Sequence, residues 1–429
     1  MKSDKELAKT FFAQKKYEET IDVCTKLLRL DSTSLDILRL ISKSLMNIGR
    51  IEESRKYLNQ VLNLTPDDYE GLKELGKTYQ LKNDLVKAKL YYKRSILVKS
   101  NYAPALTNLG IIELIDGRKE EALSLLLKAT ESDPELAAAW ENLANAYFHF
   151  GKLDFASVNC LKSIELNANV FSSYFLLSKI LIKQEKLEEA ESTLRKTVEL
   201  NPNYFYLYFL LGKVLKDLRK NKEAEECLRK TIELNPAFFS AYYLLGLIMI
   251  QENDLKEAAS ALRKTIELKP DFKFAYSDLG AILMGFGKKN DAELLIRKAI
   301  ELDPDYAEAN CNLGSLLMSH GKLSEAELYI RKAIKFKSNF VEAHIKLGKI
   351  LNDLNRIEEA EYSLIKAIDI KSGYAEAHNE LSKVYLKKNK FHRALEEIEI
   401  ALSLDPSNHI FQAELSRIKF IEKAINRNI

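Results

Sequence analysis

The sequence predicts an all-α fold, an α-solenoid of about twelve helix-turn-helix repeats followed by one further helix. The prediction depends on prolines that recur with a fixed period and on two sets of glycines that recur at fixed positions within that period. Seven of the eight prolines are separated by 34 residues or by a whole multiple of 34, and this period continues along the chain without an insertion. A fixed period of this size is typical of stacked repeats, which bury their apolar faces against their neighbours. The phased prolines are Pro66, Pro134, Pro202, Pro236, Pro270, Pro304 and Pro406.

The first helix of each repeat is predicted from an apolar stripe. When the phased proline is position 32, positions 4, 7, 8 and 11 have helical spacing, as in Tyr208, Leu211, Gly212 and Leu215. Position 8 is always Gly, Ala or Ser, although a helical glycine costs about 1 kcal/mol relative to alanine. We therefore expect a second helix to cross closely, with the alanine of position 20 on its facing side. Repeats begin at Met1, Leu35, Tyr69, Ala103, Ala137, Phe171, Phe205, Phe239, Lys273, Ala307, Val341 and Ala375.

The turn and the second helix follow from two further patterns. Five glycines share position 15, where a chain that leaves one helix and turns back needs a positive φ. Positions 20, 24, 27 and 28 are mostly small or apolar and form the buried stripe of the second helix, which ends before the proline. The glycines of position 15 are Gly49, Gly117, Gly151, Gly287 and Gly321.

The repeat resembles a known family. Repeat 5 has Trp140, Leu143, Ala144 and Tyr147, and the pattern Trp-x2-Leu-Gly/Ala-x2-Tyr, then Ala-x3-apolar, then Pro, resembles tetratricopeptide (TPR) repeats over essentially the whole chain. The resemblance implies a right-handed superhelix and a non-catalytic scaffold whose concave groove, formed by the first helices, binds peptides or partner proteins. The array is also similar to the TPR superhelix of O-GlcNAc-type glycosyltransferases, which implies an alternative function as a substrate-recognition or targeting arm acting in trans with an enzyme.

Three segments are expected along the chain. Residues 1–34 form an atypical, capping repeat, and residues 35–408 form eleven tandem repeats. Residues 409–429 form a solvating helix in which Leu415 and Ile418 cover the last repeat. The remaining apolar residues of this tail leave a homodimer open as an alternative.

Composition excludes several classes of function. A net charge of +3 is too small to indicate nucleic-acid binding by itself, and the longest apolar run is too short for membrane insertion. Four cysteines without a CxxC pair favour a reducing compartment, and the first residues have no apolar signal core, so we expect a cytoplasmic protein. Nucleotide-binding, hydrolase and metalloprotease motifs are absent, and we expect neither a cofactor nor enzymatic activity. His344 and His378 share position 4, where we expect structural roles rather than a metal site.

The first candidate binding surface is basic. Positions 2, 5, 9, 12 and 13 lie opposite the buried stripe of the first helix, so they line the surface that is free to bind. In repeats 1 to 3, positions 5 and 9 are all cationic, which suits carboxylates, phosphates or an acidic peptide. The alternative is a solvated lysine face. These residues are Lys5, Lys9, Arg39, Lys43, Lys73 and Lys77.

The second candidate surface is aromatic and lies in repeats 6 to 9. Its large side chains predict a partner-binding patch, with self-association and internal packing as the alternatives. Two lysines beside the rings would suit a peptide that combines apolar and acidic residues. The candidate residues are Phe175, Lys179, Tyr206, Phe209, Lys213, Tyr243, Leu247 and Phe274, and Leu176, Leu210 and Leu244 extend the patch at position 6.

Overall fold

The fold comes from a computed structural model that describes residues 2–427, with side chains described from residue 4 to residue 423. Every regular element in the described range is an α-helix, and helices α1 to α25 follow one another with short turns. The predicted all-α solenoid is confirmed. The chain divides into two compact units, Met1–Lys220 and Asn221–Ile429, which are considered separately below.

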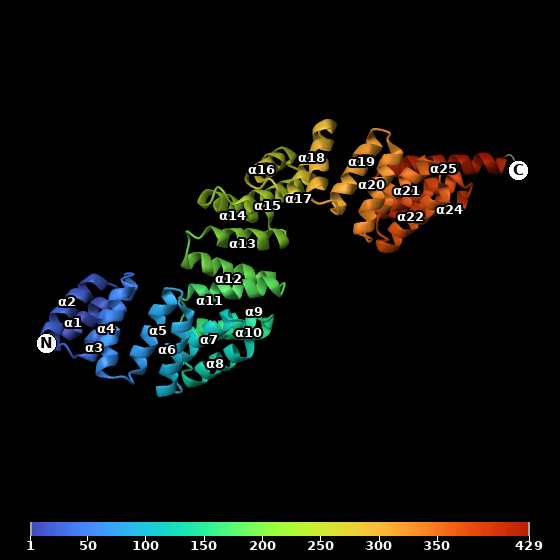
Figure 1. The fold of residues 1–429 in the computed structure, drawn as a ribbon. Coiled ribbons are helices and arrows are strands. Elements are labelled where there is room, and N and C mark those ends of the chain that lie inside the picture. Colours follow the sequence, from blue (N-terminus) through green and yellow to red (C-terminus); the bar gives the residue numbers. More distant parts are fainter. Residues whose placement is uncertain (1, 428–429) are drawn as a thin grey trace. The chain divides into compact units, whose positions relative to one another are not determined.

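Unit 1 contains helices α1 to α13, drawn from blue to green in Figure 1. Each helix packs against the next, and odd-numbered helices such as α7 and α9 also contact each other. The helices are α1 (Lys2–Ala13), α2 (Tyr17–Leu30), α3 (Leu35–Asn47), α4 (Ile51–Leu64), α5 (Tyr69–Leu81), α6 (Leu85–Val98), α7 (Ala103–Ile115), α8 (Lys119–Ser132), α9 (Ala137–His149), α10 (Leu153–Leu166), α11 (Phe171–Lys183), α12 (Leu187–Leu200) and α13 (Phe205–Asp217).

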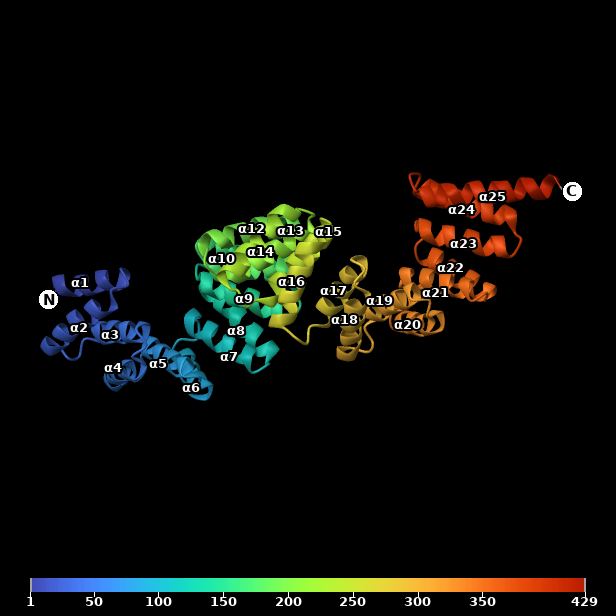
Figure 2. The same cartoon turned by 90° about the horizontal axis from the view of Figure 1, so that it is seen from above.

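Unit 2 contains helices α14 to α25 and follows the same alternation, as Figure 2 shows from a second direction. Its contacts again join consecutive helices and successive odd-numbered helices, such as α17 with α19. The helices are α14 (Asn221–Leu234), α15 (Phe239–Gln251), α16 (Leu255–Leu268), α17 (Lys273–Gly285), α18 (Lys289–Leu302), α19 (Ala307–Ser319), α20 (Leu323–Phe336), α21 (Val341–Asp353), α22 (Ile357–Ile370), α23 (Ala375–Lys387), α24 (Phe391–Leu404) and α25 (His409–Arg427).

The helix boundaries follow the 34-residue period of the prolines closely. Odd-numbered helices from α3 to α23 begin at the residues where the 34-residue period predicts that repeats begin, and α25 begins one period after α23. Position 15 has a positive φ at all five predicted glycines, for example +81° at Gly49, so this prediction is confirmed. The same backbone conformation occurs where position 15 is not glycine, which the sequence did not indicate. These residues are Lys15, Asn83, Glu185, Arg219, Asn253, Asn355 and Asn389.

The glycines at position 8 lie at a close contact in which the predicted alanine of position 20 takes part through its backbone, while the nearest atoms belong to the side chain at position 24. A Cβ built at Gly314 would lie 2.5 Å from Ile330 Cδ1, and one at Gly348 would lie 2.5 Å from Leu364 Cγ. Both neighbours occupy position 24, one turn beyond the alanine of position 20. Position 20 contributes its carbonyl oxygen instead, since Ala326 O is 3.3 Å from the Gly314 Cβ. The large position 24 side chain therefore fills the space that the glycine leaves.

Helix α25 has both buried and exposed apolar residues. Ile418 and Phe411 are buried, whereas Ile410 and Phe420 are largely exposed. Its buried residues contact the same hydrophobic core as the helices before it, and Leu415 is packed against that core. The helix therefore covers the end of the core along one side.

Candidate interaction surfaces

The six cations of the predicted basic surface lie on α1, α3 and α5, and most of them contact nearby carboxylates. Arg39 is the most strongly engaged, because its guanidinium donates a hydrogen bond to Asp68, whose side chain is almost fully buried. Asp68 also accepts from the Gly71 amide at 2.7 Å and so caps the amino end of α5. Arg39 therefore fastens α3 to the start of α5.

The lysines of this surface are similarly engaged. Glu74 lies 2.6 Å from Lys73 and 3.6 Å from Lys43, and its own side chain is nearly buried. Lys9 pairs with Glu6 on its own helix, and Lys5 donates to Ser34 Oγ at 3.4 Å. Lys77 is exposed, with no ion pair among the described residues. The surface is thus largely charge-compensated, which weakens the expectation of an anionic ligand.

In unit 1, α11 and α13 carry a cluster of partly exposed aromatic rings. Phe175 stacks on Phe171 with ring centroids 5.8 Å apart and meets Tyr206 edge-on at 6.3 Å. Tyr206 stacks on Phe209 at 5.8 Å. Tyr204, just before α13, contacts Phe175 at 5.9 Å. The structure therefore brings together all three predicted aromatic residues of this unit.

Two lysines accompany these rings. The Lys179 ammonium lies 5.4 Å from the Phe175 ring centroid and 5.3 Å from that of Phe148. Lys213 is exposed on α13. Neither lysine forms an ion pair within the described residues of unit 1, unlike Lys43 and Lys73. This surface therefore combines π-faces with uncompensated positive charge.

Two leucines that were assigned to the aromatic surface do not belong to it. Leu176 and Leu210 are only 7% and 8% exposed, because position 6 of these helices faces the neighbouring helices rather than solvent. Leu244 and Leu247, in unit 2, remain partly exposed on α15. The exposed aromatic surface is therefore narrower than the sequence indicated.

In unit 2, Tyr243 and Phe274 lie within a chain of aromatic contacts from α15 to α19. Phe272 meets Tyr243 at 4.9 Å and Phe274 at 5.2 Å, and Phe274 meets Tyr306 at 5.2 Å. Lys273 lies about equally close to the Phe274 and Tyr306 rings and also pairs with Asp303. Phe274 is the most exposed ring of this group.

An acidic residue that sequence reasoning missed lies beneath these rings. Tyr243 Oη donates to Asp278 Oδ2 at 3.1 Å. Burial raises the pKa of Asp278 to about 6, although the hydrogen bond from Tyr243 opposes the shift and nearby Glu308 adds to it. The charge state of Asp278 therefore changes between mildly acidic and neutral solution.

Three aromatic residues of these clusters were not predicted from the sequence, although they share one position of the repeat. Tyr204, Phe272 and Tyr306 all occupy position 34, directly before an odd-numbered helix. Aromatic residues recur there in most of the repeats. The position lies outside the helix, so a search for helical spacing did not include it.

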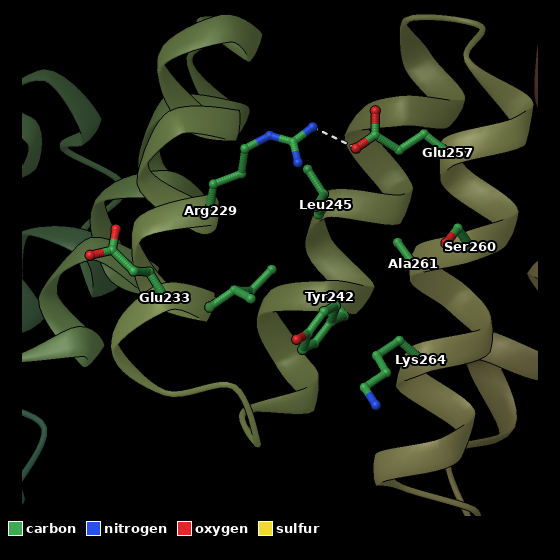
Figure 3. Close-up of a pocket in the computed structure, with 9 residues that line it drawn as sticks. Arg229, Glu233, Tyr242, Leu245, Glu257, Ser260, Ala261 and Lys264 are labelled. Carbon is green, nitrogen blue, oxygen red and sulfur yellow. Dashed lines mark hydrogen bonds and ion pairs between the residues drawn. The ribbon is translucent and has the colours of Figure 1, made fainter.

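A pocket of about 510 Å³ lies on the even-numbered helices of unit 2, as Figure 3 shows. Arg229 on α14 reaches across to Glu257 on α16, while Tyr242 and Leu245 of α15 lie between these two helices. The lining carries two cations and two carboxylates, so the pocket is electrically balanced. Its remaining lining residues are Ile232, Glu233, Ser260, Ala261 and Lys264.

His378 and Cys311 are buried in the packed interior. His378 is buried between Glu397, 2.7 Å from Nδ1, and the Ser372 carbonyl oxygen, 2.9 Å from Nε2, and the bond to Glu397 raises its pKa. Burial raises the pKa of the Cys311 thiol to about 11, which keeps it protonated. Among the described residues, no group of three or more His, Cys, Asp or Glu side chains could hold a metal ion. None of the described helices combines the length and apolarity needed to cross a membrane.

Comparison with known proteins supports a repeat family. A family model described as the cilia and flagella-associated protein 70 C-terminal domain matches residues 68–280. Tetratricopeptide-repeat models match residues 11–76, 275–306, 295–327, 341–374 and 375–408. No curated protein sequence matches.

One solved structure supports the same fold, and two others are similar to shorter parts of the chain. A chain in the crystal structure of the APC/C hetero-tetramer Cut9-Hcn1 is 14% identical in sequence to this chain. The match has a TM-score of 0.54 and covers 96% of this chain and 95% of the other. YrrB, described as a TPR protein with an unusual peptide-binding site, is 26% identical over 43% of this chain and 95% of its own, with a TM-score of 0.39. MamA is 26% identical over 41% of this chain and 96% of its own, with a TM-score of 0.38. The phased pattern, the repeat models and the helical fold together show that the chain is a tetratricopeptide-repeat protein.

Proposed function

We propose that this chain is a non-catalytic protein-interaction scaffold, and that the surface of α11 and α13 in unit 1 binds a peptide segment of a partner protein. The observation that carries the proposal is the cluster of Phe175, Tyr206 and Phe209 beside Lys179 and Lys213. Most cations of the corresponding face on α1, α3 and α5 contact carboxylates, as Lys43 and Lys73 contact Glu74.

The chemistry of the surface indicates its partner. Aromatic rings offer apolar area that a peptide can cover, each ring at about 1.5–3 kcal/mol when fully buried. The two lysines would pair with carboxylates of the same peptide and would favour its approach at low ionic strength. A segment that alternates apolar and acidic side chains meets both requirements.

A synthetic peptide that alternates Phe or Leu with Glu tests the proposal. Fluorescence anisotropy of the labelled peptide should show binding at least tenfold tighter than that of the same peptide with Lys in place of Glu. Charge reversal by Lys179→Glu with Lys213→Glu should reverse this preference, and Phe209→Glu should weaken both peptides.

Lys196→Glu, on α12, is the control for a charge reversal outside this surface, because Lys196 is exposed and, among the described residues, its ion pair is with Glu199 of its own helix. This variant should leave the peptide preference unchanged. Equal affinity for the acidic and basic peptides, or a preference unaffected by the double reversal, would contradict the assignment.

A further inference from the structure

The outward face of α6 is apolar, which distinguishes it from a solvated helix. Ala88, Tyr92 and Ser95 of α6 are fully buried. At about 100° per residue, the direction opposite these residues is occupied by three apolar side chains. They are Val86, Leu90 and Leu97, which are 83%, 54% and 83% exposed.

Cations border this apolar stripe. Helix α6 contains four basic residues and no acidic residue. Lys89 is directed toward Glu113 and Asp116, at 2.8 and 2.7 Å. Lys93 and Arg94 are exposed on either side of the stripe and have no carboxylate partner among the described residues. The outward face is therefore apolar along its centre and positive along its edges.

Helix α10 has a complementary outward face in the same unit. Phe155, Val158 and Leu161 are between 53% and 66% exposed. Asp154 and Glu165 lie on this face as exposed carboxylates. Asp154 accepts a hydrogen bond from Gln184, and Glu165 pairs with Lys162 of its own helix at 3.1 Å.

Helix α8, between α6 and α10 in the chain, extends the acidic surface. Glu120 and Glu131 are exposed on its outward side beside a single cation, Lys128, and Leu127 is 39% exposed. Because α6, α8 and α10 bury the same repeat positions, each presents its outward face away from the odd-numbered helices, and Figure 1 shows the three helices in succession along unit 1. The side of unit 1 that these helices form thus carries a basic apolar face on α6, followed by apolar faces on α8 and α10 in which carboxylates outnumber cations.

We propose that this side of unit 1 joins two copies of the chain, with α6 of each copy against the α8–α10 face of the other. A two-fold arrangement is isologous, so the basic part of each copy contacts the acidic part of the other, and the same contact is made twice. Seven exposed apolar side chains per copy, at roughly 60–120 Å² each, would bury on the order of 1,000–1,500 Å² in total. An area of that order overlaps the range of specific protein interfaces.

A second copy fits this surface better than a lipid bilayer does. The cations of α6 would attract an anionic membrane, but the carboxylates of α8 and α10 face the same side and would be repelled by it. A second copy places those carboxylates opposite the partner's Lys93 and Arg94 instead. The same charges that oppose membrane binding therefore favour the dimer.

Paired charge reversals test the dimer. In one variant Lys93 and Arg94 are both changed to Glu, and in the other Glu131 and Glu165 are both changed to Lys. Light scattering and sedimentation of the wild-type chain, 49.1 kDa as a monomer, should show a dimer that weakens as salt is added. Each variant alone should dimerise at least tenfold more weakly, because both of its contacts become like-charged. An equimolar mixture of the two variants should dimerise again, since each basic surface then meets an acidic one.

Lys26→Glu with Lys56→Glu is the matched control, because it makes the same change in net charge at exposed sites on α2 and α4. This variant should dimerise like the wild type. A wild-type chain that stays monomeric at high concentration overturns the proposal, and so does a dimer that neither reversal weakens. A mixture that stays monomeric refutes the charge pairing. Binding of the monomer to phosphatidylserine vesicles that is lost with the α6 reversal would assign the surface to a membrane instead.

Discussion

Asp278→Asn should stabilise unit 2 at neutral pH, because the native fold holds this carboxyl with a raised pKa. Its pKa rises from 3.8 to about 6, mainly through burial. The folded state therefore binds the proton more tightly than the unfolded chain does, and the associated stability is present below pH 3.8 and lost as the pH rises through 6. A shift of about two pKa units corresponds to about 3 kcal/mol. Asparagine carries no charge and can still accept from Tyr243, so the variant should regain up to about 3 kcal/mol at pH 8 and almost nothing at pH 4.

The assay must report on α15 and α17, because repeat arrays open locally as well as globally. Amide hydrogen exchange of these two helices at pH 5 to 8, corrected for intrinsic rates, measures the difference in opening free energy between wild type and variant. Asp305→Asn, at an exposed carboxyl of the same unit, controls for net charge. A difference that is constant across this pH range would refute the reasoning. Weaker protection of Asp278→Asn at pH 8 would show that the charged carboxylate stabilises the fold.

Three further predictions concern the repeat framework and can be checked by urea denaturation followed by circular dichroism. Gly314→Ala should cost about 1–2 kcal/mol, because its Cβ would lie 2.5 Å from Ile330, whereas Gly285→Ala, with nothing within 4 Å, should stabilise by about 0.5 kcal/mol. Equal effects of the two changes would contradict the close-contact interpretation. Glu185→Gly should stabilise by about 0.5–1 kcal/mol, since its φ is +58°, and a loss of stability would show that its side chain matters more than its backbone. Asp68→Ala should cost about 2–4 kcal/mol, because it removes the α5 cap and leaves Arg39 without its nearly buried partner, while Asp68→Asn should cost less. Similar losses for Ala and Asn would argue against a capping role.

The framework could be predicted from the sequence because each of its determinants is local. Pro202 and Pro236 mark turns whatever surrounds them, and Gly49 permits a positive φ through its own lack of a Cβ. Residues three and four apart must share a helical face. Twelve consistent copies of such local preferences leave few alternatives to stacked helix pairs.

The candidate surfaces could be predicted only in part. Phe175, Tyr206 and Phe209 were found because position alone shows that they lie opposite the buried stripe. The compensation of Arg39 by Asp68 could not be found in the same way, because the two residues are 29 positions apart and meet only when α3 and α5 are stacked. Charges cancel or remain according to distances between repeats, which the spacing along one helix does not contain.

The sequence by itself determined the helices, their period and the turns between them, because these depend on backbone preferences within a few residues. The tertiary structure decided which side chains remain available to a partner. It paired most of the predicted cations of α1, α3 and α5 with nearby carboxylates and left Lys179 and Lys213 uncompensated within the described residues of unit 1. It also placed Asp278 beneath aromatic rings. These outcomes depend on burial and on distances between side chains of different repeats, and only the stacked helices set those distances.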